Sequence, residues 1–285
     1  MIHYIENEFL KIGVRERGAE LCSLYSKQAA AEYLWQGDNS VWSGQSPILF
    51  PIVGRLMDDS YRLNGKEFIL EKHGFARKMD WQFSGGDDKS ITFVLRDTQE
   101  TRKHYPFSFD LSVCFTLSGR TLSVSHDVLN TNNGTMYFSV GAHPGFNCEM
   151  GDVLEFECNE DAKTEKIDLE SALLLPETFP LLKNEKEIVI TKDIFNEDAL
   201  ILSDLKSNYV TLKSPNHDRR VTVTFGGAPY LGIWAKPGAP YVCIEPWFGV
   251  NDSMQKVNDF SEKYQIVSLA AGQKFNFTWT ATVSE

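Results

Sequence analysis

The sequence lacks the features that would suit a membrane, a nucleic acid or an exported protein. No stretch of about 18 uninterrupted apolar residues occurs, so no transmembrane helix is expected. The first residues, Met1 to Glu8, have no basic segment followed by an apolar one, which predicts a cytoplasmic location. Lysine and arginine number 28 against 39 aspartates and glutamates, and the net charge of −11 argues against nucleic acid or anionic lipid as partners.

The cysteines are few and their spacing carries no signal. There are five of them, an odd number without any C-x-x-C pair, so neither a disulfide framework nor a zinc knuckle is indicated, and we expect buried thiols. The sequence also lacks a G-x-S-x-G elbow, a P-loop and a glycine fingerprint opening a long helix. Serine hydrolases, nucleotide hydrolases and dinucleotide enzymes are therefore disfavoured.

Short segments that alternate apolar and polar residues are abundant, and aromatic residues make up 12% of the chain. Such alternation is typical of half-buried strands, because successive side chains of a strand point to opposite faces. The clearest segments are Ile91 to Leu95, Phe109 to Leu117, Thr121 to Leu129, Val221 to Phe225 and Lys274 to Trp279. Asn64-Gly65 is a strong hairpin signal between two more strands. The predicted fold class is all-β.

Helical periodicity is brief. It occurs around Glu170 to Leu175 and Ser253 to Tyr264, too short for the crossover helices of a parallel sheet. No internal repeat and no long Pro/Gly/Ser linker marks a boundary, so we expect one domain over residues 1–285. His126 falls in register with apolar residues of one strand, which predicts a hydrogen-bonded histidine in the core rather than a site residue.

Four segments hold polar residues that a plain β core does not need. Arg55 follows an apolar run and a glycine, and His73 precedes a glycine that permits unusual backbone angles; a surface charge and a turn histidine are the competing readings. His143 lies in G-A-H-P-G, where a strand runs into a turn framed by glycine and proline. Glu245 ends the apolar strand Tyr241 to Ile244, where an unpaired carboxylate would be costly.

Such a glutamate should have a partner, be protonated or serve in catalysis, because desolvation raises the pKa of a carboxyl group toward the range useful for a general base. Two histidines and a glutamate could also bind zinc or iron. However, H-x-H and H-E-x-x-H pairs are absent. We therefore expect no metal.

Taken together, these segments resemble the aldose 1-epimerase (galactose mutarotase) family, and more closely its LacX-like branch. The resemblance rests on the order and approximate spacing of motifs across most of the chain: G-R-L at 54–56, H-G-F-A-R at 73–77, G-A-H-P-G-F-N at 141–147, N-E-D-A-L at 196–200, L-G-I-W at 231–234 and I-E-P-W at 244–247. It implies a large antiparallel β-sandwich, called a supersandwich, with a sugar cleft and no metal or organic cofactor. The implied partner is a small-molecule sugar, and the oligomeric state stays open.

The resemblance also implies residue roles. Glu245 matches the general base and His143 the general acid, while Arg55 and His73 match the pair that positions the substrate. Asp198 matches a sugar-binding aspartate, although its surroundings depart from the common pattern and Asp193 or Asp204 could compete. Trp234 is the candidate stacking surface for the sugar ring.

The function expected from this resemblance is interconversion of the α and β anomers of a hexose such as galactose or glucose. Opening the ring takes a proton from the C1 hydroxyl and gives one to the ring oxygen, so one base and one acid suffice. A hexose 6-phosphate is an alternative substrate, for which Arg77, Lys78 and Lys236 could supply cations. A non-catalytic carbohydrate-binding protein is a second alternative. A glycosidase would use paired carboxylates, whereas a glutamate and a histidine form the pair here.

Overall fold

The computed structural model describes residues 1–285 and confirms the all-β prediction. Every paired strand runs antiparallel to its neighbours, in two large sheets, one four-stranded sheet and two two-stranded sheets. The only α-helix, α1 (Thr101–His104), has four residues, and the 3₁₀ turns are Met57–Asp59, Ala76–Lys78 and Phe260–Glu262. None of the helices has the length and apolar character needed to cross a membrane.

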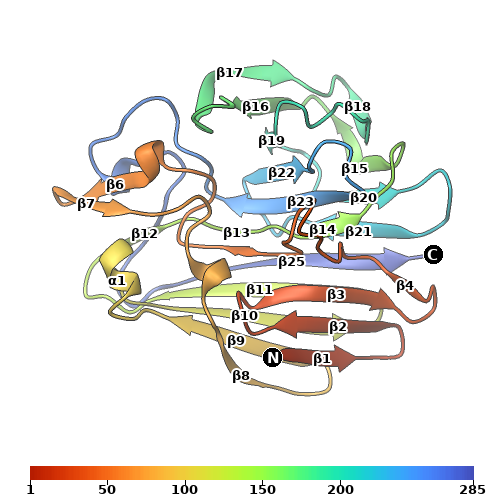
Figure 1. Cartoon of the computed structure of the whole chain (residues 1–285), viewed down its shortest axis with the longest axis horizontal. Helices are drawn as coiled ribbons and strands as arrows, with labels where there is room; N and C mark the ends of the chain where they lie inside the picture. The colour runs from red at the N-terminus through yellow and green to blue at the C-terminus, as the bar shows by residue number, and fades with distance from the viewer.

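The nine-stranded sheet runs in Figure 1 from β8 at the bottom, through β25, to β15 and β18 at the upper right. In spatial order its strands are β18 (Glu185–Val189), β15 (Val153–Glu160), β20 (Tyr209–Lys213), β21 (Arg220–Thr224), β25 (Lys274–Ser284), β11 (Thr121–Asn130), β10 (Phe109–Ser118), β9 (Ser90–Arg96) and β8 (Gln82–Gly86). Along β10 and β11 buried and half-buried residues alternate almost without exception. One face of these strands therefore builds the core, as the alternation in the sequence predicts.

The eight-stranded sheet carries the residues of interest. Its order is β17 (Leu174–Pro180), β16 (Lys163–Ile167), β19 (Leu200–Ser203), β22 (Tyr230–Trp234), β23 (Tyr241–Phe248), β13 (Val140–Ala142) and β5 (Ile48–Leu49), with β14 (Gly145–Asn147) also paired to β23. Val242 and Ile244 of β23 belong to the main core. Because side chains alternate, Glu245 and Trp247 point to the opposite face of the sheet.

The remaining strands flank these two layers. The four-stranded sheet contains β1 (Ile2–Glu6), β2 (Leu10–Arg15), β3 (Glu20–Ser26) and β4 (Ala31–Glu32), and the small pairs are β6 (Ser60–Leu63) with β7 (Lys66–Ile69) and β12 (Met136–Phe138) with β24 (Val267–Leu269). The β6–β7 turn is the predicted Asn64-Gly65 hairpin, and both residues have positive φ as its turn type requires. Figure 1 shows this hairpin and α1 at one end of the molecule.

Three expectations from the sequence are wrong in detail. Residues 170–175 form a turn that enters β17, and residues 253–264 are irregular apart from the 3₁₀ turn, because neither segment has a packed helical face. All five cysteines are free, but Cys158 is exposed and Cys114 half-buried, so only three are buried thiols. His126 does lie in the core, yet neither ring nitrogen has a hydrogen-bond partner.

A main core runs through the chain from Ile5 to Val283 and joins the two large sheets. A smaller apolar cluster, which includes Ile167, Ile201 and Trp247, lies on the other side of the eight-stranded sheet. The expectation of one domain over residues 1–285 stays a prediction, and the shared core is consistent with it.

Candidate active site

A cleft of about 230 Å³ opens on the outer face of the eight-stranded sheet, over β22 and β23. Five of the six residues singled out in the sequence line it: His73, His143, Asp198, Trp234 and Glu245. They come from four separate regions of the chain, which the antiparallel sheet and its loops bring to one place. The cleft is therefore the candidate active site.

Glu245 forms the floor of the cleft. It is 1% exposed on β23, and burial raises the pKa of its carboxyl group well above 4.5. Its partner across the strands is Gly232, where a Cβ atom would lie 2.5 Å from the Trp247 indole. The absence of a side chain at Gly232 thus leaves room for Trp247 to lie beside Glu245, and the indole N–H and the charge of Lys72 both favour the ionised carboxylate, against the effect of burial.

His143 stands next to this carboxyl group. Its Nε2 lies 3.2 Å from Oε2 of Glu245, and the side chain is presented by the turn between β13 and β14. The main chain of this turn is fixed, since the Pro144 carbonyl accepts a hydrogen bond from the backbone N–H of Ile244. Burial lowers the pKa of His143 to about 3, so its imidazole is neutral near pH 7.

His73 faces His143 with its ring in a fixed tautomer. Its backbone has φ +66°, and the following Gly74 has φ +67° where a Cβ atom would lie 2.3 Å from the Phe50 carbonyl oxygen. The backbone N–H of Gly54 donates to Nδ1 of His73 at 3.1 Å. Nδ1 therefore accepts and the ring proton resides on Nε2. Burial lowers the pKa of His73 well below 6.5, which keeps the ring neutral and Nε2–H available as a donor.

Asp198 and Trp234 lie on the β22 side of the cleft. Asp198 is half-buried with φ +69°, and its Oδ1 accepts from the backbone N–H of Ala199 at 2.7 Å. Asp193 and Asp204 are exposed and do not line the cleft, so of the three aspartates considered only Asp198 lies where a bound sugar could contact it. The Trp234 ring centroid lies 5.9 Å from that of His143, roughly edge to face.

Arg55 does not line the cleft. Its Nε and Nη2 donate to the two carboxylate oxygens of Asp59 at 2.8 and 2.6 Å, and both side chains are 38% exposed. Within the Gly-Arg motif it is Gly54 that contacts residues of the cleft. Its backbone N–H donates to His73, and its lack of a side chain leaves room for Asn251. A role for Arg55 in sugar binding stays a prediction.

The sequence reasoning missed three residues that line the cleft. Trp42 lies 5.1 Å from His143 between ring centroids and closes one wall. Asn251 contributes an amide, and Lys72 a cation with no carboxylate within ion-pair distance. Trp42 and Asn251 carried no local signal, whereas Lys72 directly precedes the His-Gly step and could have been singled out.

Among the three cations considered for a phosphate, only Arg77 lines the cleft. Its Nη2 donates to the Lys72 carbonyl at 2.8 Å, while its Nε has no partner, and burial lowers the pKa of its guanidinium group. Lys78 pairs with Glu71, and Lys236 donates to the Ser40 carbonyl at 3.2 Å. Lys72 and Arg77 are thus two cationic groups in the cleft without an acidic partner.

One cluster of side chains at the floor of the cleft, which includes a buried cysteine beneath it, has a composition that could coordinate a metal. The ligand atoms of His143, Cys243 and Glu245 lie within 4.8 Å of one another, and all three residues are buried. Burial and the neighbouring Glu245 raise the pKa of the Cys243 thiol, which disfavours the thiolate that would bind a metal. The expectation that the site works without a metal stays a prediction.

Comparison with known proteins agrees with this arrangement. Residues 1–280 match the family model described as aldose 1-epimerase. The chain belongs to the aldose 1-epimerase family. It is 33% identical over 283 residues to the chromosomal protein LacX of Lactococcus lactis subsp. lactis, with 93% of each chain covered.

Solved structures in this family share the fold closely. A galactose mutarotase related enzyme from Lactobacillus acidophilus superposes with a TM-score of 0.94 at 34% identity, covering all of this chain and 98% of that one. A galactose mutarotase-like protein from Lactobacillus casei gives a TM-score of 0.94 at 32% identity, with both chains fully covered. These likenesses confirm the predicted mutarotase-like β-sandwich and support a sugar epimerase.

Proposed function

We propose that this member of the aldose 1-epimerase family is a mutarotase that interconverts the α and β anomers of a hexose such as galactose or glucose. The observation that carries the proposal is the buried pair of Glu245 and His143, 3.2 Å apart on the floor of a polar cleft. Glu245 is the base that removes the proton of the C1 hydroxyl. His143 is the acid that protonates the ring oxygen as the C1–O5 bond opens to the aldehyde.

The pair needs a single proton for this reaction. Burial favours the uncharged forms of both groups, so in the empty cleft the proton rests on Glu245. The positive charge of Lys72 and sugar hydroxyls donating to the carboxylate favour its transfer to His143, 3.2 Å away. Ring opening returns a proton to Glu245, and closure on the other face of the carbonyl runs the same transfers backwards. No net proton is taken up or released over the cycle.

The other cleft residues position the sugar while C1 turns. The Nε2–H of His73 is a donor and the carboxylate of Asp198 an acceptor, which suits hydroxyl groups. Trp234 and Trp42 supply indole surfaces on which the apolar face of a pyranose packs. Fixing the ring in this way lowers the entropic part of the barrier.

Time-resolved polarimetry on freshly dissolved α-galactose and α-glucose tests the proposal. We expect the protein to accelerate the change in optical rotation beyond the spontaneous rate, and Glu245→Gln to reduce this acceleration by about 100-fold to 10,000-fold, the usual contribution of a general base. The exposed Glu177 offers a matched control, and Glu177→Gln should retain full activity. Sugar binding to Glu245→Gln without any acceleration by the wild type would instead indicate a non-catalytic binding protein.

A phosphorylated hexose is the second candidate substrate, and the unpaired Lys72 and Arg77 favour it. The chain is also 26% identical over 151 residues, 48% of each chain, to an Escherichia coli (strain K12) protein provisionally named glucose-6-phosphate 1-epimerase. If the phosphate is bound here, Arg77→Ala should raise the KM for the 6-phosphate and leave that for the free hexose unchanged. Exchange between the anomeric proton signals in NMR spectra measures both rates.

A further inference from the structure

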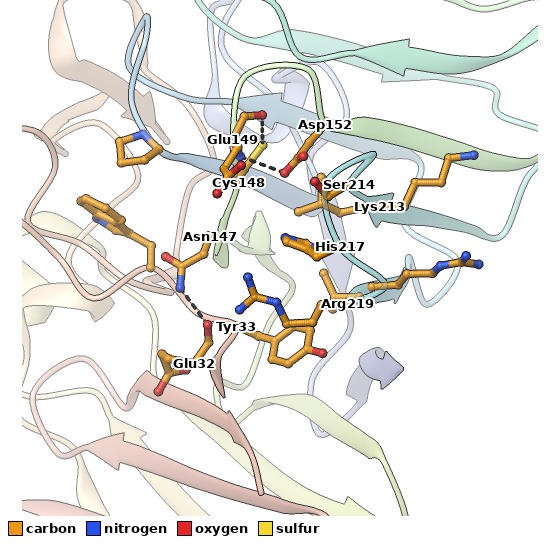
Figure 2. A pocket seen from close by; sticks show the side chains of 15 residues that line it. Glu32, Tyr33, Asn147, Cys148, Glu149, Asp152, Lys213, Ser214, His217 and Arg219 are labelled. Carbon is orange, nitrogen blue, oxygen red and sulfur yellow. Dashed lines mark hydrogen bonds between the residues drawn. The ribbon is translucent and has the colours of Figure 1, made fainter. Parts of the chain in front are cut away.

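A second cavity of about 250 Å³ lies apart from the active site and shares no lining residue with it. It is bounded by the chain after β14, by the connection between β20 and β21, and by the segment that follows β4. Figure 2 shows the side chains that surround it: Asp152 and Cys148 at the upper end, Arg219 and Tyr33 at the lower end, and His217 between them. Its volume is close to the 230 Å³ of the active-site cleft.

Two buried polar atoms in the wall of this cavity form no hydrogen bond with the protein. Asp152 is only 3% exposed, and while its Oδ2 accepts from the backbone N–H of Glu149 at 2.8 Å, its Oδ1 has no partner. Nδ1 of His217 is also buried without a partner. Buried polar atoms normally find hydrogen bonds, so these two atoms in the cavity wall are available to water or to a ligand that enters the cavity.

Arg219 adds an unpaired cation. Its guanidinium group has no ion-pair partner, and Figure 2 shows it reaching into the space between Tyr33 and His217. Other charges near the cavity are already engaged: Lys213 bonds Glu155 and Glu187, both by its Nζ. Arg219 therefore offers several N–H donors to whatever fills the cavity.

Charges of both signs line the cavity. Glu32, Glu149 and Asp152 are acidic, and Arg219 and Arg220 are basic, while the charge of Lys213 is already bound by Glu155 and Glu187. An anion would meet the carboxylates, and a cation would meet the guanidinium groups. A neutral ligand whose groups both donate and accept satisfies Asp152, His217 and Arg219 together, and hydroxyl groups have this property.

The rest of the wall is apolar and partly aromatic. Tyr33, Trp35 and Pro240 form this side, with Tyr33 and Trp35 following the short strand β4. Aromatic rings beside acid, amide and guanidinium groups suit a molecule with hydroxyls at its rim and C–H bonds on its face. We propose that this cavity is a second binding site for a neutral monosaccharide, separate from the catalytic cleft.

The two sites share a wall of stacked aromatic rings. Trp35 stacks on Tyr241 at 5.0 Å between ring centroids, Tyr241 stacks on Trp42 at 5.1 Å, and Trp42 lies 5.1 Å from His143. The backbone N–H of Trp35 also donates to the carbonyl of Gly145, two residues after His143. Three rings in succession, those of Trp35, Tyr241 and Trp42, thus connect the second cavity with His143.

Titration of isotope-labelled protein with D-galactose, followed by ¹H–¹⁵N NMR, tests this site. The backbone N–H of Asp152 reports on the second cavity, and the indole N–H groups of Trp42 and Trp234 report on the cleft. We expect two sets of shifts with different dissociation constants. Arg219→Ala should weaken the Asp152 set at least tenfold and leave the cleft set and the mutarotation rate unchanged.

The exposed Arg62 lies outside both cavities, so Arg62→Ala is the matched control and should change neither set. Shifts confined to the cleft, or an Asp152 set that is equally strong in Arg219→Ala, would overturn the second site. An Asp152 set produced by inorganic phosphate and not by galactose would also overturn it, since the cavity would then bind an anion. Because binding is read at each site separately, these outcomes do not depend on whether the protein proves to be a mutarotase.

Discussion

His126 makes the stability of this protein depend on pH in a way that can be calculated. Its side chain is 1% exposed on β11, and its ring stacks on that of Phe277 with 4.4 Å between centroids. Neither ring nitrogen has a hydrogen-bond partner, and burial lowers the pKa of His126 from 6.5 to about 3. The folded protein therefore keeps this imidazole neutral at pH values where the unfolded chain protonates it.

The sign and size of the effect follow from this difference. Below pH 6.5 the unfolded state binds a proton that the folded state does not. As the pH is lowered from 6.5 toward the folded pKa of about 3, the free energy of unfolding therefore decreases by about 1.4 kcal/mol per pH unit. Between about pH 8 and about pH 5 the loss attributable to His126 is about 2 kcal/mol. For a chain of this length that corresponds to about 3 °C in Tm.

The substitution His126→Phe removes the titrating group and keeps an aromatic ring against Phe277. The difference in free energy of unfolding between His126→Phe and the wild type should be about 2 kcal/mol more favourable to the variant at pH 5 than at pH 8. This change is expected whether the variant is more or less stable than the wild type at pH 8. Urea denaturation of both proteins at the two pH values measures this change. The exposed His104 provides the control, because His104→Gln should leave the pH dependence unaltered. Parallel pH profiles for His126→Phe and wild type would show that His126 titrates normally in the folded protein.

Three further predictions concern the active site. The background-corrected rate of mutarotation should stay constant from about pH 7 down to about pH 5, since burial lowers the pKa of His143 to about 3 and raises that of Glu245. A decrease in this rate centred near the ordinary histidine pKa of 6.5 would contradict a pair that shares one proton. Gly232→Ala should lower kcat by about tenfold to 100-fold, because the new Cβ would lie 2.5 Å from the Trp247 indole beside the Glu245 carboxyl group. Gly134→Ala, with nothing within 4 Å of its Cβ, should leave kcat unchanged in the same assay. Dialysis against a chelator should leave activity intact, and stoichiometric zinc or iron in elemental analysis, lost together with activity, would refute metal-free catalysis.

The strands of the fold were predictable because each one is half-buried. In β10 and β11 the alternation of buried and half-buried positions is nearly complete, so a local pattern of two residues suffices to identify them. The helical periodicity at 170–175 and 253–264 did not predict helices correctly, because it too is only a local pattern. A spacing of three or four residues forms a helix only when a tertiary surface covers its apolar face, and none does so here.

The site was predictable where burial and charge conflict within one segment. Glu245 lies in an apolar strand, where a buried carboxylate without a partner would be costly. In the structure its neighbour in the cleft is His143. Trp42 carries no such conflict, since its place beside His143 depends on a contact between residues a hundred positions apart. Arg55 failed to reach the cleft because Asp59, four residues later, offers it a bidentate partner in the same turn.

The depth of Glu245 and His143 in the sheet suits the exchange of roles that the proposed reaction requires. An exposed glutamate would ionise near pH 4.5 and be a weak base, whereas an exposed histidine would be half protonated near pH 6.5. Burial moves the pKa of Glu245 upward and that of His143 downward, so a single proton is held between them instead of one on each or none. Lys72 opposes this trend by favouring the ionised carboxylate. A reaction that opens and closes the same ring must run equally well in both directions, and a pair that differs only in where its one proton lies meets that requirement.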